Sequence, residues 1–146
     1  MRILIILLFV SFSGFSQEDI ERYKLYPTEN INIFLKLDTS TGLVDMVQKR
    51  SGDVDDRITP INFIPIAYDQ EDIDLYMSRG DSVNWEFLNQ HSKSDEPLLA
   101  QVGRFKLYPT QNIWTFLMQD VISGHTYQVQ WGFDFEKRML FLITNN

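Results

Sequence analysis

An internal repeat constrains this chain more than any other feature of its sequence. Residues 22–48 return at 104–130, 82 positions later and without a gap, with 14 identities among 27 positions. With a shift of one residue, the match extends to 57–58 against 138–139. A unit of about 40 residues is too small to fold alone without disulfides or a metal. The two copies must therefore pack on each other or pair at their edges.

Alternating apolar and polar residues predict β-strands in each copy. In the second copy, Phe105 and Leu107 alternate with Lys106 and Tyr108, which is the period of two that a strand requires. In the first copy, every second residue from 31 to 37 is apolar. Further strands are predicted at 44–48 and 57–63 in the first copy and at 126–131 and 138–144 in the second.

A hairpin loop is predicted after the second strand of each copy, at 38–42 and 120–124. An aspartate at each loop entry can accept backbone N–H bonds, and Gly42 and Gly124 at the exits can adopt a positive φ. Each copy is thus expected to form an antiparallel meander of three to four strands. The predicted fold class is all-β, with the two duplicated meanders forming a sandwich or an open barrel.

The segment between the copies, 64–102, is not repeated. Alternation at 73–77 and at 83–87, on either side of an Arg-Gly-Asp turn, favours a further hairpin, and a short helix over 82–90 is the alternative. The expected organisation is one β domain over 17–146, with the first repeat unit at about 22–63, the insertion at about 64–102 and the second unit at about 103–146.

The first 16 residues have the three-part pattern of a cleavable export signal. Arg2 supplies a positive charge, 3–10 is a continuous apolar run, and Gly14 and Ser16 are small residues at the positions that a signal peptidase reads. The run is shorter than the roughly 18 apolar residues that a membrane-spanning helix needs. We therefore expect an exported protein, periplasmic or extracellular, whose mature chain starts at Gln17 and does not span a membrane.

The composition narrows the possible partners. The chain contains no cysteine, so it has neither a disulfide nor a thiol nucleophile. Its 20 acidic residues outnumber 13 basic ones, which gives a net charge of −7. Because nucleic-acid binding rests on clustered lysine and arginine, this balance argues against a nucleic-acid partner. It is compatible with a basic protein partner.

Motifs of the familiar enzyme classes are absent from the sequence: there is no His-Glu-x-x-His, no nucleophile elbow and no phosphate-binding glycine loop. Acidic clusters occur at 53–56 and 69–74, but they lack the glycine and the spacing of a calcium loop. A pair of these carboxylates could serve glycoside hydrolysis, and solvated loops explain them as well. We expect no metal ion, no cofactor and no catalytic residue, and the sequence favours a non-enzymatic role.

Aromatic residues distinguish the second copy from the first. Trp114 replaces Asn32, and Trp131 replaces Lys49. Two phenylalanines then stand where the first copy has a charged, glycine-containing stretch. The candidate binding residues are therefore Trp114, Trp131, Phe133 and Phe135.

Two interpretations of these rings are open. Alternation at Trp131, Phe133 and Phe135 would place all three on one side of an extended segment, as a surface for a protein or a sugar. Alternatively, the rings fill the core. Phe34 and Phe116 lie on the strand face opposite the other apolar residues, so something must cover a second apolar face of each meander. The cover is the other unit, the insertion or another subunit.

The string from Gly103 to Trp114, followed by 127–131, resembles a repeat of small Bacteroides-type bacterial proteins for which no activity is known. The resemblance covers both repeat units, and it implies a bacterial setting and, together with the export signal, a periplasmic or extracellular one. The first unit departs from the pattern at Lys49, where the second has Trp131.

The sequence as a whole favours an exported, non-catalytic binding or protein-interaction module. Its partner is expected to be a protein or a glycan, and the two apolar faces are compatible with a homo-oligomer. Two alternatives stay open. One is a small periplasmic hydrolase that uses paired carboxylates on glycan or cell-wall material, and the other is an acidic inhibitor or immunity protein.

Overall fold

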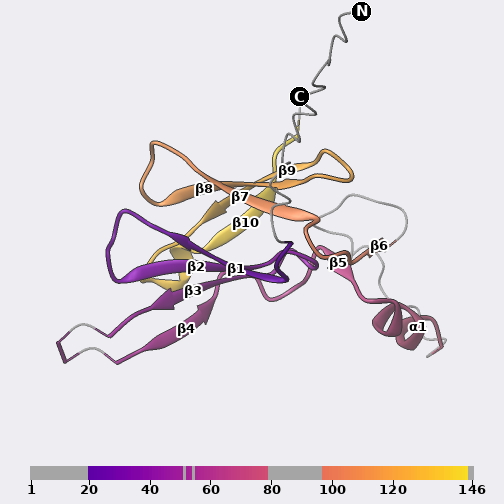
Figure 1. Ribbon diagram of the computed structural model, residues 1–146, viewed down its shortest axis with the longest axis horizontal. Coiled ribbons are helices and arrows are strands. Elements are labelled where there is room, and N and C mark those ends of the chain that lie inside the picture. Colours follow the sequence, from indigo (N-terminus) through magenta and orange to yellow (C-terminus); the bar gives the residue numbers. More distant parts are fainter. Residues whose placement is uncertain (1–19, 51, 54, 79–96, 145–146) are drawn as a thin grey trace, which may run out of the picture.

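The computed structural model describes residues 20–50, 52–53, 55–78 and 97–144. They form two four-stranded antiparallel sheets that lie face to face, with a two-stranded sheet and an α-helix beside them (Figure 1). Neither four-stranded sheet closes on itself, so the predicted all-β fold is confirmed and is a sandwich rather than a barrel. The predicted export signal and the Arg-Gly-Asp turn lie outside the described residues.

The first repeat unit forms a sheet in which neighbouring strands follow the order of the chain. Its strands are β1 (Tyr23–Pro27), β2 (Ile33–Asp38), β3 (Val44–Gln48) and β4 (Arg57–Pro60). β1 ends at Pro27, because proline has no N–H to donate to the ladder. The Thr28 hydroxyl then accepts a bond from Asn30 N at 3.1 Å and tightens the turn into β2. β4 also ends at a proline, Pro60, and not at Phe63 as predicted.

The second repeat unit forms the same sheet. Its strands are β7 (Phe105–Pro109), β8 (Thr115–Asp120), β9 (Thr126–Gln130) and β10 (Met139–Leu142). Each strand begins 82 residues after its counterpart and pairs in the same register, so the two copies are equivalent meanders. Arg57 faces Gln48, and Met139 faces Gln130. The predicted one-residue shift is therefore wrong: Arg138 precedes β10 and instead donates to backbone carbonyls of the preceding loop.

The two sheets present opposite faces of the repeat to each other. Leu35 in β2 is 0% exposed, whereas its counterpart Leu117 in β8 lies on the outer face and is only partly buried. Conversely, Leu107 in β7 is 4% exposed, whereas its counterpart Leu25 in β1 is 58% exposed. Because successive residues of a strand point to opposite faces, the inversion applies to each sheet as a whole. The face that forms the core in one unit is the outer face of the other, and each unit accordingly has apolar residues on both faces.

One hydrophobic core lies between the inner faces of the two sheets. The first sheet contributes Ile33, Leu35, Leu37, Val44 and Met46, and the second contributes Phe105, Leu107, Phe116, Met118, Tyr127, Val129, Trp131 and Leu140. Backbone contacts join the sheets at one corner, where Phe105 N donates to Thr39 O at 2.9 Å. The other unit therefore covers only one face of each meander.

The hairpin loops of the two units have the predicted chemistry. Gly42 has a φ of 78° and Gly124 a φ of 79°, which confirms the expected positive values. Asp38 Oδ1 accepts a bond from Ser40 N at 2.9 Å, and Asp120 Oδ1 accepts one from Ile122 N at 2.9 Å. These aspartates fix the loops that hold β2 against β3 and β8 against β9.

The insertion differs from the predicted hairpin. It contains β5 (Ala67–Tyr68), α1 (Gln70–Ser78) and β6 (Leu98–Leu99), and β5 pairs with β6 in parallel. The prediction of a strand at 73–77 is therefore wrong, because these residues belong to α1. Asp69 precedes the helix and its carbonyl accepts from Ile73 N at 3.1 Å, while Glu71 and Asp72 place negative charge in the first turn, where the helix dipole favours it. The proposed partner strand and the alternative helix lie outside the described residues.

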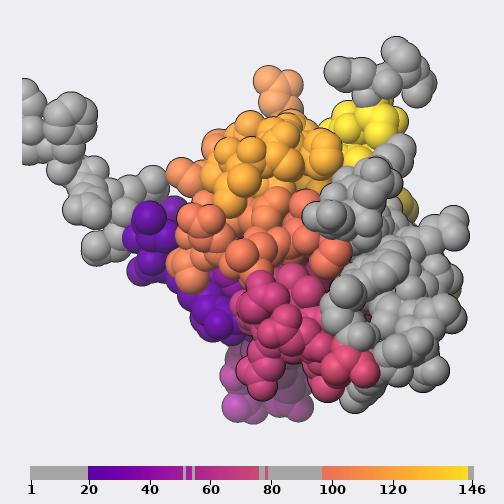
Figure 2. Space-filling view, turned by 90° about the vertical axis from the view of Figure 1, so that its right-hand side faces the viewer, coloured from indigo at the N-terminus to yellow at the C-terminus, as the bar shows by residue number. Residues whose placement is uncertain are grey.

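Figure 2 shows the side of the molecule on which the insertion lies, where the chain at β5 packs beside the chain at β6. In the described part of the chain, no helix is long and apolar enough to cross a membrane.

Candidate functional site

Three aromatic rings gather at one end of the second sheet. The ring centroids of Trp114 and Trp131 lie 4.6 Å apart, and those of Trp131 and Phe133 lie 6.1 Å apart. Phe133 stands edge-on to both tryptophans, at 79° to Trp114 and 80° to Trp131. Such edge-on geometry is favourable for aromatic pairs, and it fixes the angle between the rings.

Strand ends position the two tryptophans. Trp114 immediately precedes β8, and its N–H donates to Asn112 Oδ1 at 3.0 Å. Trp131 immediately follows β9: its backbone N–H donates to Trp114 O at 3.0 Å, and its indole Nε1 donates to Ile113 O at 3.0 Å. Trp131 is 2% exposed. Its buried ring therefore packs against the more exposed ring of Trp114.

A compact loop positions Phe133. A side chain at Gly132 would place its Cβ 2.9 Å from the Cβ of Lys137, so only glycine allows the chain to fold this closely. The Arg138 guanidinium then donates to Gly132 O at 2.8 Å and to Phe133 O at 2.7 Å. The loop is thus held by hydrogen bonds from the Arg138 side chain to backbone carbonyls, and the exposed Phe133 ring takes no part in them.

The three rings line an open depression of about 390 Å³. Trp114 is 40% exposed and Phe133 is 52% exposed, so both rings are accessible. Polar groups complete the lining: Asn112, Gln130, Asp134 and Lys137. The depression therefore combines flat apolar surfaces with hydrogen-bonding groups.

An ion pair on the rim of the depression is close and well formed. Lys137 Nζ lies 2.6 Å from Asp134 Oδ2. The hydrogen bond and the positive charge of Lys137 lower the pKa of Asp134, and the same contact raises the pKa of Lys137. Both groups are therefore charged near neutral pH, and the rim has no net charge from this pair.

The structure brings together three of the four predicted binding residues. Trp131 belongs to the core, so the interpretation that its ring lies on an exposed surface is wrong. Phe135 lies apart, in a 3₁₀ helix η1 (Phe135–Lys137), with its ring 6.1 Å from that of Phe63. β9 ends at Gln130, so the predicted extended segment does not continue through the rings.

The first unit has the same backbone at this position without the rings. Lys49 N donates to Asn32 O at 2.7 Å, which matches the bond from Trp131 N to Trp114 O at 3.0 Å. The backbone frame is therefore common to both units, and only the second unit places aromatic side chains on it.

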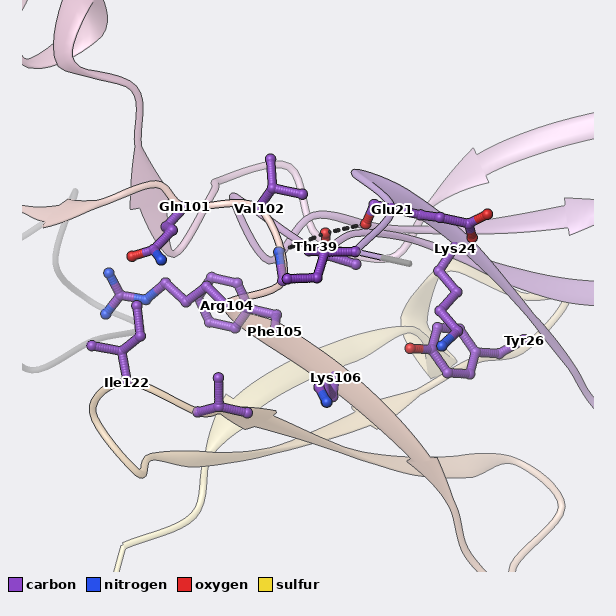
Figure 3. A pocket seen from close by; sticks show the side chains of 13 residues that line it. Glu21, Lys24, Tyr26, Thr39, Gln101, Val102, Arg104, Phe105, Lys106 and Ile122 are labelled. Carbon is purple, nitrogen blue, oxygen red and sulfur yellow. Dashed lines mark hydrogen bonds between the residues drawn. The ribbon is translucent and has the colours of Figure 1, made fainter. Parts of the chain in front are cut away.

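A second cavity, of about 280 Å³, lies between β1 and β7 (Figure 3). Polar groups of its lining already serve the fold. The Thr39 hydroxyl donates to Glu21 O at 2.7 Å and accepts from Gly103 N at 3.1 Å, as Figure 3 shows. Arg104 lies 2.7 Å from Asp120 through Nη2 and donates to Leu99 O through Nη1. This cavity is a seam between the two units rather than a built binding site.

The buried carboxylate of the second unit also has a structural role. Burial alone would raise the pKa of Asp120, but hydrogen bonds from Arg104, Ser123 and two backbone N–H groups outweigh it and lower the pKa. The aromatic depression itself is lined by one carboxylate, Asp134, and not by the pair that glycoside hydrolysis needs. Among the described residues, no group of three or more histidines and carboxylates is placed to hold a metal ion.

The polar groups of the depression were not among the residues predicted from the sequence. Asn112 and Gly132 carried a signal: an asparagine two residues before Trp114 predicts a turn, and a glycine between aromatic residues suggests a close approach of the backbone. Asp134 and Lys137 carried no such signal, because the contact between them depends on how the loop folds.

Comparison with protein-family models, curated proteins and solved structures found no match for this chain. The resemblance to the Bacteroides-type repeat therefore stays a prediction.

Proposed function

We propose that this protein is an exported, non-catalytic binding module that holds a glycan against the rings of Trp114 and Phe133. One observation carries the proposal. The two units have the same backbone frame at this end, but only the second adds rings to it, and two of those rings are exposed. A role in folding alone does not account for the exposed rings, because the first unit forms its sheet with Asn32 and Lys49 in the equivalent positions.

The chemistry of a sugar suits both parts of the depression. A pyranose ring has a face of C–H groups, which packs on a flat aromatic ring, and a rim of hydroxyls that both donate and accept hydrogen bonds. Trp114 supplies an exposed ring, and Asn112 and Gln130 supply amides that can pair with hydroxyls. An open, mostly apolar depression with a few polar groups is also the usual form of a ligand site.

The charges on the rim favour a neutral ligand. Aromatic rings also bind cations, but here Lys137 lies beside Asp134 and offsets its charge. A cation would meet the Lys137 ammonium, and an anion would meet the Asp134 carboxylate. We therefore favour neutral sugars over charged ligands. The predicted export signal is consistent with a protein that meets glycans outside the cytoplasm.

Titration of the protein with a panel of soluble oligosaccharides tests this proposal. The panel contains chains of glucose, mannose, xylose and N-acetylglucosamine, and isothermal calorimetry measures binding. Phe133→Ala and Trp114→Ala should each weaken the best binder by about tenfold or more, equivalent to about 1.4 kcal/mol. Phe141→Ala is the matched control, because Phe141 is 42% exposed on the outer face of the same unit and lies outside the depression.

Two results would contradict the proposal. If no member of the panel binds, the ligand is not a neutral sugar of these classes. If a sugar binds but neither depression variant weakens it more than Phe141→Ala does, the site lies elsewhere. Circular dichroism of each variant confirms that the fold is retained.

A further inference from the structure

A second exposed surface lies on the outer face of the first sheet, opposite the core. Tyr23 is 56% exposed, Leu25 58% and Ile58 63%. Phe34 and Val47 lie between them and are partly buried. Phe34 faces Val47 across the β2–β3 ladder, and Val47 faces Ile58 across the β3–β4 ladder, so the apolar row crosses three strands. We call this surface the outer patch.

The second unit shows what this face does when it is covered. Every member of the outer patch has a counterpart 82 residues later that belongs to the core. These counterparts are Phe105, Leu107, Phe116, Val129 and Leu140, and they are 0%, 4%, 3%, 0% and 8% exposed. In this molecule, therefore, the same face of the same meander already packs against another sheet.

The opposite outer face, on the second unit, differs in character. Gln119, Thr126 and Gln128 stand there in place of Leu37, Val44 and Met46, which are buried in the first unit. A head-to-tail stack would press the outer patch onto these amides and hydroxyls, and it would continue without end. That face also carries Leu117 and the exposed Phe141, but the polar replacements interrupt its apolar surface and argue against such a stack. The outer patch, with its continuous row from Phe34 to Ile58, is therefore the sheet face better suited to association.

The charges within the outer patch are self-complementary. Lys36 Nζ lies 2.7 Å from Asp45 Oδ2 between Leu25 and Pro60, and both side chains are partly exposed. Their counterparts in the core of the second unit are uncharged, Met118 and Tyr127. One cation next to one anion suits a two-fold axis, because rotation brings Lys36 of each copy to Asp45 of the other.

The outer patch also has room for a projecting side chain. A hollow of about 370 Å³ lies beside it, lined in part by Tyr23, Lys36 and Phe63. We propose that the protein forms a symmetric homodimer in which the outer patches of two copies pack face to face. The proposal does not depend on glycan binding, since the aromatic depression lies in the other unit.

Sedimentation of the protein over a range of concentrations tests the dimer. The wild type should sediment as a dimer at high concentration. Ile58→Glu and Leu25→Glu should each raise the dimer dissociation constant by about a hundredfold or more, because they bury an unpaired charge in the interface. Phe141→Glu, on the outer face of the second unit, is the matched control and should leave the dimer unchanged.

A mixing experiment tests the two-fold contact itself. Lys36→Asp makes the centre of the patch wholly acidic, and Asp45→Lys makes it wholly basic. Each variant alone should be monomeric because like charges face each other, and an equal mixture of the two should form a heterodimer.

Three results would overturn the proposal. The first is a wild type that stays monomeric at every concentration. The second is a dimer that survives Ile58→Glu but is lost in Phe141→Glu. The third is a mixture of the two charge variants that stays monomeric although both variants retain their thermal unfolding transitions.

Discussion

The inversion of the two repeat units leads to a quantitative expectation for matched substitutions. Leu25 and Leu107 occupy the same position in the repeat and differ in exposure, at 58% and 4%. Truncation of a buried leucine to alanine removes packing and leaves a cavity, which destabilises a protein by about 2–5 kcal/mol. Truncation of an exposed leucine changes stability by about 0.5 kcal/mol or less. Leu107→Ala should therefore be several-fold more destabilising than Leu25→Ala.

In a second pair of equivalent leucines, the residue of the first unit is the buried one. Leu35 is 0% exposed in the first unit, and its counterpart Leu117 lies on the outer face of the second. Leu35→Ala should be as destabilising as Leu107→Ala, and Leu117→Ala should be mild. If one unit were simply less stable than the other, both of its variants would be affected alike. Only opposite packing faces give the crossed pattern.

Urea unfolding followed by tryptophan fluorescence measures this effect, because the buried Trp131 reports on the core. With an urea slope of about 2 kcal/mol per molar, a loss of about 3 kcal/mol lowers the midpoint by about 1.5 M. The measurement belongs at low protein concentration, so that dimer dissociation does not contribute. Equal midpoint shifts for Leu25→Ala and Leu107→Ala, or for Leu35→Ala and Leu117→Ala, would refute the inversion.

Further substitutions address the loops and the buried polar groups. Gly124→Ala should be destabilising by about 1 kcal/mol because residue 124 has a positive φ. Gly42→Ala should be more destabilising, since the added Cβ would also lie 3.0 Å from Ile66 Cδ1. Equal melting temperatures for the two variants would contradict this difference. Since the pKa of Asp120 is lowered in the folded protein, its contribution to stability is present above the ordinary pKa of about 3.9 and is lost as the pH falls through the lower folded value. The free energy of unfolding, measured in urea at several pH values, should therefore decrease less in acid for Asp120→Asn than for the wild type. An equal decrease in the two proteins would contradict this role of Asp120. Tyr127→Phe should be neutral or stabilising by about 1 kcal/mol, because the buried hydroxyl has no hydrogen-bond partner among the described residues and burial raises its pKa; a clear loss of stability would show that the hydroxyl is satisfied.

The sequence predicted the strands and turns well because their causes are local. Period-two alternation defined the meanders, and Gly42 and Gly124 took the positive φ that their hairpins require. The inversion was not predictable in the same way. Leu25 and Leu35 lie on opposite faces, and both faces are apolar, so alternation alone could not show which face is buried. That choice is made by contacts between the two units.

The errors have similar physical reasons. The alternation at 73–77 is short, and the acidic first turn of α1, with Glu71 and Asp72, was the competing signal for a helix. Trp131 alternates with Phe133 in sequence, but the strand has already ended, and the chain at Gly132 folds closely against Lys137 between the two rings. One ring becomes core and the other becomes surface, a distinction that depends on where β9 ends.

Chemical-shift mapping tests the central claim about the aromatic depression most directly. Nuclear magnetic resonance spectra of the protein are recorded with and without the oligosaccharide that binds best in the panel. The backbone amides of 112–114 and 130–137 and the indole N–H of Trp114 should shift together, with little change at the outer face of the first sheet. Shifts confined to the seam between β1 and β7, or no shift at all with any sugar, would contradict the claim that the second unit binds glycans at its exposed rings.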